Sequence, residues 1–164
     1  LLIEWNTGKK KPTFIGLMTG AVAGLATITP AAGFVDIYSA ALIGIIAAFG
    51  CFAAVKYKEK KGWDDALDVW GVHGMGGIIG TICVGFFANS TINDAIPNGL
   101  FFGGDGMLLF KECAAILFAT SYAFFFTLLL FKTINKFIPV KVTDEDQELG
   151  LDLSHHGEVA RQQR

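Results

Sequence analysis

The chain alternates between long apolar runs and short polar segments. Four runs contain no Asp, Glu, Lys or Arg: residues 13–35, 37–55, 69–93 and 113–131. Each holds about 20 residues or more, the length that an α-helix needs to cross the hydrocarbon core of a bilayer. The pattern predicts an all-α membrane protein with four transmembrane helices, over residues 13–33, 36–55, 68–88 and 110–131.

The two ends of the chain differ from these runs. Residues 139–164 are polar, mixed in charge and too poor in apolar side chains to build a core of their own. We therefore expect a transmembrane helical region over residues 1–138 and a cytoplasmic tail over residues 139–164. The chain opens on LLIEW and not on Met, so we expect it to be a fragment that begins with the end of an earlier helix.

Composition supports the membrane interpretation and excludes other classes. Hydrophobic residues make up 52% of the chain, charged residues only 17%, and the net charge is −2. No basic run carries interleaved aromatic residues, so no nucleic-acid partner is expected. Cys51, Cys83 and Cys113 lie in different apolar runs without CxxC spacing, so we expect packing residues and neither a metal site nor another cofactor site.

Lysine residues predict the orientation in the membrane. The loops at residues 31–36 and 89–106 contain no Lys or Arg, and Lys111 is the one lysine expected on their side. The positive-inside rule makes the lysine-rich side cytoplasmic. With four spans, both termini lie on that side of the cell membrane. The lysines that flank the spans there are Lys9, Lys10 and Lys11, then Lys56, Lys58, Lys60 and Lys61 in a solvated charge cluster, then Lys132, Lys136 and Lys141.

The stretch 69–85, VWGVHGMGGIIGTICVG, combines many glycines with one titratable side chain, His73. Glycine-rich membrane helices let other backbones come close. A lone imidazole at membrane depth is costly unless it faces a partner, a cavity or a pathway. At about 100° per residue, His73 shares a face with Val69, Gly76, Gly77 and Gly80. Either a neighbouring helix approaches this strip or a small solute slides past it.

Three interpretations of His73 compete. It bonds a neighbouring helix, it ligates a metal or haem, or it lines a narrow pathway and handles a proton or a hydrogen-bonding solute. A ligand role lacks further ligands at helical spacing, since only Met75 lies near. Neutral imidazole donates from one nitrogen and accepts at the other, which suits a small solute with N–H groups. The surrounding glycines favour the pathway.

Two further features flank the apolar runs. Asp64, Asp65 and Asp68 stand at the start of the glycine-rich helix, where the helix dipole favours negative charge. They cap the helix or, alternatively, relay a cation. In the first run, Pro30 disfavours helix at Thr29. This break is either an ordinary helix end or irregular backbone that lines a cavity at membrane depth.

Three motifs resemble those of the ammonium transporter family (Amt/Mep, related to the Rh proteins). Residues 68–77, DVWGVHGMGG, resemble its second pore-histidine motif. Residues 23–33, AGLATITPAAG, are similar to its eighth transmembrane helix, and residues 150–160, GLDLSHHGEVA, to its C-terminal signature. The motifs stand in the family's order. The resemblance therefore identifies the chain as roughly helices eight to eleven, preceded by the end of helix seven.

The resemblance implies a fold and a function. The family has eleven transmembrane helices, arranged as two inverted halves and a final helix, and forms homotrimers in which each protomer has its own narrow apolar pore. Ammonium loses its proton outside, ammonia crosses, and the proton follows along paired imidazoles; no enzymatic activity is implied. One alternative is an ammonium sensor or receptor of the same fold that signals through its tail. Another is a membrane protein that uses His73 as a cofactor ligand.

The resemblance also assigns residues and partners. His73 is one of two pore histidines, Val69 lines the same wall one turn earlier, and Thr29 lies near the periplasmic vestibule. The other pore histidine belongs to the half that this sequence lacks. The tail signature implies contact between subunits and docking of a PII-type signalling protein at the cytoplasmic face. Its residues here are Gly150, Asp152, His156, Gly157 and Glu158, beside an additional His155 that we expect to be incidental.

Overall fold

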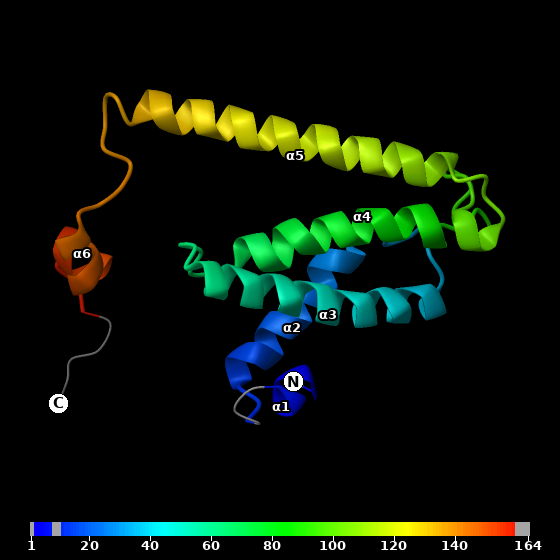
Figure 1. Ribbon diagram of the computed structural model, residues 1–164, viewed down its shortest axis with the longest axis horizontal. Helices are drawn as coiled ribbons and strands as arrows, with labels where there is room; N and C mark the ends of the chain where they lie inside the picture. The colour runs from blue at the N-terminus through cyan, green and yellow to red at the C-terminus, as the bar shows by residue number, and fades with distance from the viewer. Residues whose placement is uncertain (1, 8–10, 160–164) are drawn as a thin grey trace. The chain divides into compact units, whose positions relative to one another are not determined.

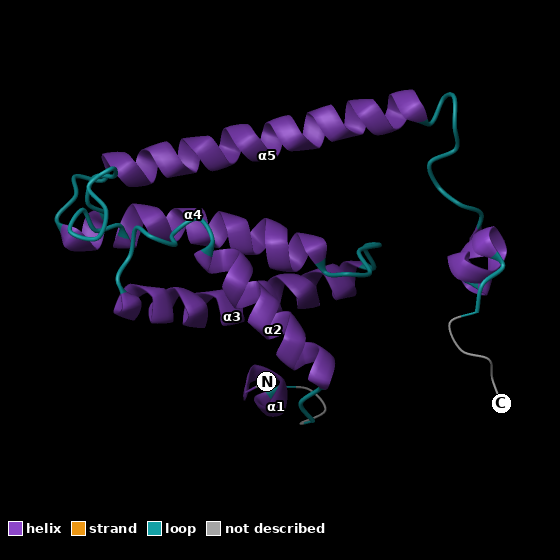
Figure 2. Ribbon diagram, turned by 180° about the vertical axis from the view of Figure 1, so that it is seen from behind, coloured by secondary structure: helices purple, strands orange, loops and turns teal. Residues whose placement is uncertain are grey.

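The structure is a computed structural model that describes residues 2–7 and 11–159, and these contain helices and no strands (Figure 2). This confirms the all-α prediction. Lys9 and Lys10 of the first basic segment and Ala160 of the tail motif lie outside the described residues. The elements in chain order are α1 (Leu2–Asn6), α2 (Phe14–Ile28), α3 (Ile37–Lys61), η1 (Trp70–Gly74), α4 (Met75–Phe87), η2 (Leu100–Phe102), α5 (Met107–Ile134), α6 (Asp144–Leu149) and η3 (Asp152–His156).

The chain forms two compact units, Leu1–Phe118 and Ala119–Arg164, whose boundary falls within α5. In the first unit, α2, α3 and α4 pack against one another, and α3 and α4 run side by side (Figure 1). Their shared core is made largely of small and β-branched side chains, so the helices approach closely. The buried members are Ala31, Ile43, Cys83, Val84, Phe87, Ala88 and Leu108 in one cluster, and Ala23, Cys51 and Val72 in another.

Helix α2 is shorter than the apolar run that contains it. The Thr13 side chain caps its start by accepting from Gly16 N at 2.9 Å. The helix ends at Ile28 because Pro30 has no backbone N–H to continue the ladder. Residues 29–34 then form tight turns in which the amides of Ala31 and Ala32 donate to Ile28 O. Ala31 is fully buried, so this break packs against the core.

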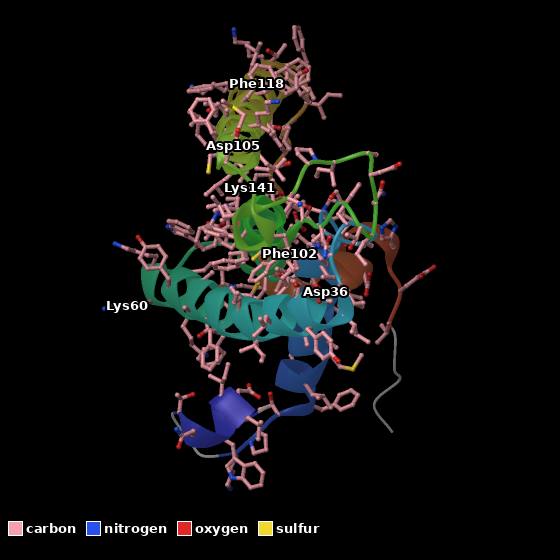
Figure 3. The ribbon with its side chains drawn as sticks, turned by 90° about the vertical axis from the view of Figure 1, so that its right-hand side faces the viewer. Asp36, Lys60, Phe102, Asp105, Phe118 and Lys141 are labelled. Carbon is pink, nitrogen blue, oxygen red and sulfur yellow. The ribbon has the colours of Figure 1, made fainter. Side chains whose placement is uncertain are left out.

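Helix α3 is longer than expected at its C-terminal end. Asp36 begins it, with Oδ1 accepting from the amides of Tyr38 and Ser39 at 2.9 Å each. The helix continues through the lysine cluster to Lys61 and ends at Gly62, whose φ of 64° suits a residue without Cβ. Asp36 and Lys60 mark its two ends in Figure 3. Lysines favour the last helical turn because they complement the helix dipole.

Within residues 2–7 and 11–159, three helical stretches are long and apolar enough to cross a membrane: α3, the continuous stretch Trp70–Phe87, and α5. Helix α2 has only 15 residues, fewer than the roughly 20 that span a bilayer core. Several apolar helices of this length fit a multi-pass membrane protein. The count of four spans and the division between residues 138 and 139 stay predictions.

The segment between α4 and α5 is irregular, as its Asn, Pro and Gly content predicts. Near its start, Asn89 N donates to Phe34 O at 2.9 Å, and Gly99 N donates to Ala88 O at 2.8 Å. The first bond ties the loop to the turn after α2, and the second brings Gly99 back to the start of the loop. Phe101 of η2 packs on Phe87 with ring centroids 5.2 Å apart.

Candidate functional site

The candidate site is built around the start of the helix that carries His73. Asp65 lies four residues before Val69, the residue whose amide begins the helix and has no partner within it. Its Oδ1 accepts from Val69 N and its Oδ2 from Trp70 N, both at 2.9 Å. One carboxylate therefore binds two of the amides that a helix start leaves free. For Asp65, this arrangement agrees with the predicted role as a helix cap.

Asp68 also lies at this helix start, but its carboxylate contacts a lysine instead of the helix amides. Its φ of 54° is positive, which is uncommon for a residue with a Cβ. Its carboxylate Oδ1 lies 2.6 Å from Lys58 Nζ, and its carbonyl accepts from Val72 N at 2.8 Å. Asp68 thus joins the end of α3 to the first turn of the His73 helix.

Lys58 is not part of a solvated charge cluster, as the lysine run had led us to expect. It is 9% exposed, because residues 43, 47, 51, 54 and 58 follow one buried face of α3. Its Nζ also donates to Asp65 O at 2.8 Å. The neighbouring Lys56 and Lys60 are exposed, and Lys60 projects outward from the end of α3 (Figure 3).

His73 lies in a π-helical turn, η1, and not in a regular α-helix. The amide of Met75 donates to Trp70 O, five residues back, which inserts one extra residue into the helical ladder. Such turns occur often at functional sites. Val72 points into the core between α2 and α3, while His73 and Val69 are exposed on the surface of the first unit. Both residues that the resemblance assigns to the pore wall are therefore exposed, and their place in a pore stays a prediction.

The glycines around His73 divide into two groups. A Cβ at Gly80 would collide with the carbonyl oxygen of Thr27, and one at Gly76 would lie 2.9 Å from Thr27 Oγ1. Helix α2 therefore occupies this part of the strip, and glycine permits the close contact. At Gly77, by contrast, an added Cβ would meet no described atom within 4 Å. Of the three glycines in the predicted strip, Gly77 is the one that no described residue covers.

Thr29 lies apart from His73. It ends α2, and its hydroxyl donates to Leu25 O at 2.7 Å. Among the described residues, no hydrogen bond joins Thr29 to His73. The neighbouring Pro30 Cγ would contact a Cβ at Gly80 at 3.1 Å, so Thr29 belongs to the region where α2 meets α4 beyond the π turn. Its place near the periplasmic vestibule stays a prediction.

The tail residues belong to the second unit. Gly150 and Gly157 have φ values of 89° and 66° and end α6 and η3. Asp152 begins η3, and its carbonyl accepts from Glu158 N at 3.0 Å. His156 is exposed. The predicted signature therefore folds as one compact turn.

A carboxylate on α6 organises that turn. Asp146 accepts from the Thr143 hydroxyl at 2.6 Å and lies 3.7 Å from His155 Nε2. The hydroxyl bond, followed by the nearby His155, holds the pKa of Asp146 below its ordinary value. His155, expected to be incidental, lies beside this carboxylate.

The sequence model of the Ammonium Transporter Family matches residues 1–161. The chain belongs to the ammonium transporter family. The chain is 45% identical over 163 residues to the ammonium transporter of Bacillus subtilis, a match that covers 99% of the chain and 40% of that relative. It is 42% identical over 160 residues to ammonium transporter Amt1 of Archaeoglobus fulgidus, covering 98% and 40%.

A solved structure shows the same fold. The crystal structure of Saccharomyces cerevisiae Mep2 matches with a TM-score of 0.81 at 33% identity, over 88% of this chain and 33% of that one. The chain thus has the family's helical fold and spans about 40% of the length of these curated relatives. The family match and the solved structure confirm the resemblance inferred from the motifs. The relatives are transport proteins and not enzymes.

Sequence reasoning missed two residues of this candidate site, Lys58 and Thr27. The buried face of α3 repeats at helical spacing from Ile43 to Lys58, so the periodicity could have separated Lys58 from the other lysines. Thr27 is fully buried, but nothing in its sequence context distinguishes it from Thr29. Thr27 is distinguished by the tertiary structure, in which it faces Gly76 and Gly80 where α2 crosses α4.

Proposed function

We propose that the full-length protein carries ammonium or ammonia across the cell membrane through a narrow apolar pore, and that His73 lines this pore. The observation that supports His73 most is its position: an exposed imidazole on a π turn, in a glycine-rich stretch where a Cβ added at Gly77 would meet no described atom within 4 Å. The rest of the protein would cover this surface in the assembled transporter.

The chemistry follows from the groups on that surface. An apolar constriction penalises an ion that cannot lose its charge, such as potassium. Ammonium can release a proton, and ammonia can then hydrogen-bond to the neutral imidazole, which both donates and accepts. A second histidine from outside this chain would pair with His73, and the proton would pass along the pair. Asp65 and Asp68 hold the helix start from which His73 projects.

Assembly and regulation extend the proposal. By family membership we expect a homotrimer in the lipid bilayer, with both ends of this chain in the cytoplasm. The compact turn formed by Gly150, Asp152, His156, Gly157 and Glu158 would contact a neighbouring subunit or a PII-type signalling protein at the cytoplasmic face.

The test is His73→Ala in the full-length protein, measured as methylammonium uptake and as ammonium-induced current in proteoliposomes. We expect altered uptake or selectivity with an unchanged amount of assembled protein. Lys60→Ala is the control because it truncates an exposed side chain in the same unit, and it should retain uptake. Uptake and currents that do not change in His73→Ala would contradict the pore role.

The same measurements separate the alternatives. A sensor of the same fold would bind ammonium with little flux in proteoliposomes. A protein that uses His73 as a cofactor ligand would show a metal or haem signature in its absorption spectrum, lost in His73→Ala.

A further inference from the structure

The connection between α3 and the His73 helix is short and held from two sides. On one side, the rings of Tyr57, Trp63 and Trp70 pack together, with centroids 5.7 Å apart for Tyr57–Trp63 and 5.1 Å for Trp63–Trp70. On the other side, Lys58 reaches under the helix start. The path of the backbone from Gly62 to Val69 is thereby tied to α3.

Lys58 makes two contacts that no other described lysine makes. Its ammonium donates to Asp65 O at 2.8 Å and lies 2.6 Å from Asp68 Oδ1. The side chains of Lys58 and Asp68 are 11% and 25% exposed, so water screens this pair less than a surface pair. A single cation thus joins two of the three aspartates that precede the helix, Asp65 through its backbone carbonyl and Asp68 through its carboxylate.

Each of those aspartates acts directly on the first helical turn. The Asp65 carboxylate binds the amides of Val69 and Trp70. The Asp68 carbonyl accepts from Val72 N, next to His73. Asp68 is held in a left-handed conformation that a residue with a Cβ rarely adopts, and the bond to Lys58 stabilises it there.

The turn itself has little freedom to adjust. A Cβ at Gly71 would lie 2.7 Å from Val55 Cγ2 and 3.2 Å from Val55 N, so the backbones of η1 and α3 are in close contact. Val72 is buried beside Cys51. Val72 N donates to Asp68 O at 2.8 Å, so a change in the position of Asp68 would alter the first turn, on which His73 follows Val72.

We propose that Lys58 is a positioning residue for His73: by holding Asp65 and Asp68 together beneath the helix start, it sets the π turn from which the imidazole projects. This inference rests on the proposed function, since it assigns a role in the passage of ammonium. Lys58 acts through the backbone and does not itself meet the solute.

The test compares Lys58→Met with Lys60→Met in the full-length protein, each in the wild-type and His73→Ala backgrounds. Lys60 is the matched control because it lies in the same helix end but is exposed. We expect Lys58→Met to lower the maximal rate of methylammonium uptake by about tenfold, with a smaller change in KM, because a small displacement of a positioned group is costly. Lys60→Met should leave the rate unchanged.

The His73→Ala background shows whether Lys58 acts through His73. There, Lys58→Met should cause no further loss of uptake. Lys58→Arg keeps the charge and should recover most of the rate. Asp68→Asn changes the charge at constant size, so it carries the same test if Lys58→Met does not accumulate as assembled protein.

Two results would overturn the inference: unchanged uptake in Lys58→Met, or an equal fold-loss in both backgrounds, which would mean a general structural role. Those results leave the proposed function standing if His73→Ala still alters uptake. If His73→Ala has no effect of its own, the pore role and the Lys58 role fall together.

Discussion

At the scale of single residues, two nearby aspartates serve the same helix start in different ways. Asp65 binds backbone amides with both carboxylate oxygens, whereas Asp68 binds the Lys58 ammonium. The difference arises from backbone conformation, because the left-handed Asp68 turns its side chain away from the helix axis and toward α3. Residue type alone does not separate them.

Asp65→Ala should destabilise the first unit. The change leaves the amides of Val69 and Trp70 without their acceptor, and loss of a cap costs about 0.5–2 kcal/mol. We expect a lower thermal unfolding midpoint in detergent. Asp64→Ala is the control, since among the described residues the Asp64 side chain makes no hydrogen bond; an equal effect of both variants would argue against the cap.

The tail turn should depend on pH through Asp146. Because its pKa is lowered from the ordinary value of 3.8 in the folded turn, ionised Asp146 stabilises the turn at all pH values above 3.8. This stabilisation is lost as the pH falls through the lowered pKa. A spin label at Val159 should therefore gain mobility only in that acidic window.

Two variants sharpen the pH experiment. Asp146→Asn keeps an oxygen acceptor but cannot ionise, so the label at Val159 should no longer respond to pH in the acidic window. Asp144→Asn should keep the wild-type response, because that side chain is 94% exposed and lies 4.0 Å from Lys141. A transition that is unchanged in Asp146→Asn would rule out this carboxylate as its source.

At the scale of elements, glycine sets how closely helices pack. Gly80 lies directly against the backbone of α2 at Thr27, and Gly85 lies against Leu109 at the start of α5. In contrast, a Cβ at Gly44 would meet no described atom within 4 Å. The same residue type therefore has different roles in helices of similar composition.

Gly80→Ala should weaken the contact between α2 and α4. The added methyl group would collide with Thr27 O, and overpacking of this kind costs about 1–3 kcal/mol. Gly44→Ala makes the same chemical change where space is open and should be neutral or stabilising, because Ala favours helix. Thermal unfolding in detergent measures both; a destabilised Gly44→Ala beside a stable Gly80→Ala would contradict the packing described here.

At the scale of the whole molecule, the chain has the fold of ammonium transporters but spans about 40% of the length of its curated relatives. Its first unit contains a core and also leaves large apolar side chains exposed, among them Phe14, Ile37 and Phe49. Lipid and the rest of the transporter are the expected neighbours of such surfaces.

The predicted orientation can be tested by labelling introduced cysteines with a membrane-impermeant maleimide, after the native cysteines are replaced by alanine. A cysteine at Asn93, in the lysine-free loop, should react in intact cells. A cysteine at Lys60 should react only after permeabilisation, because the positive-inside rule places the lysine-rich end of α3 in the cytoplasm. The reverse pattern would contradict the orientation.

Much of the fold could be predicted from the sequence, because hydrophobic run length and helix-breaking residues are local properties. The apolar runs, the break at Pro30 and the irregular segment after α4 all follow from such signals. Element ends could not be predicted as well: α3 continues to Lys61 because tertiary contacts bury Lys58.

By itself, the sequence determined that this is a helical membrane protein with a histidine in a glycine-rich helix, and its motifs determined the family. Only the tertiary structure decided which glycines are covered by α2, which threonine is buried, and which lysine reaches Asp65 and Asp68. The physical reason is that burial and ion pairing depend on how helices distant in sequence cross, and residue spacing within one helix does not specify that crossing.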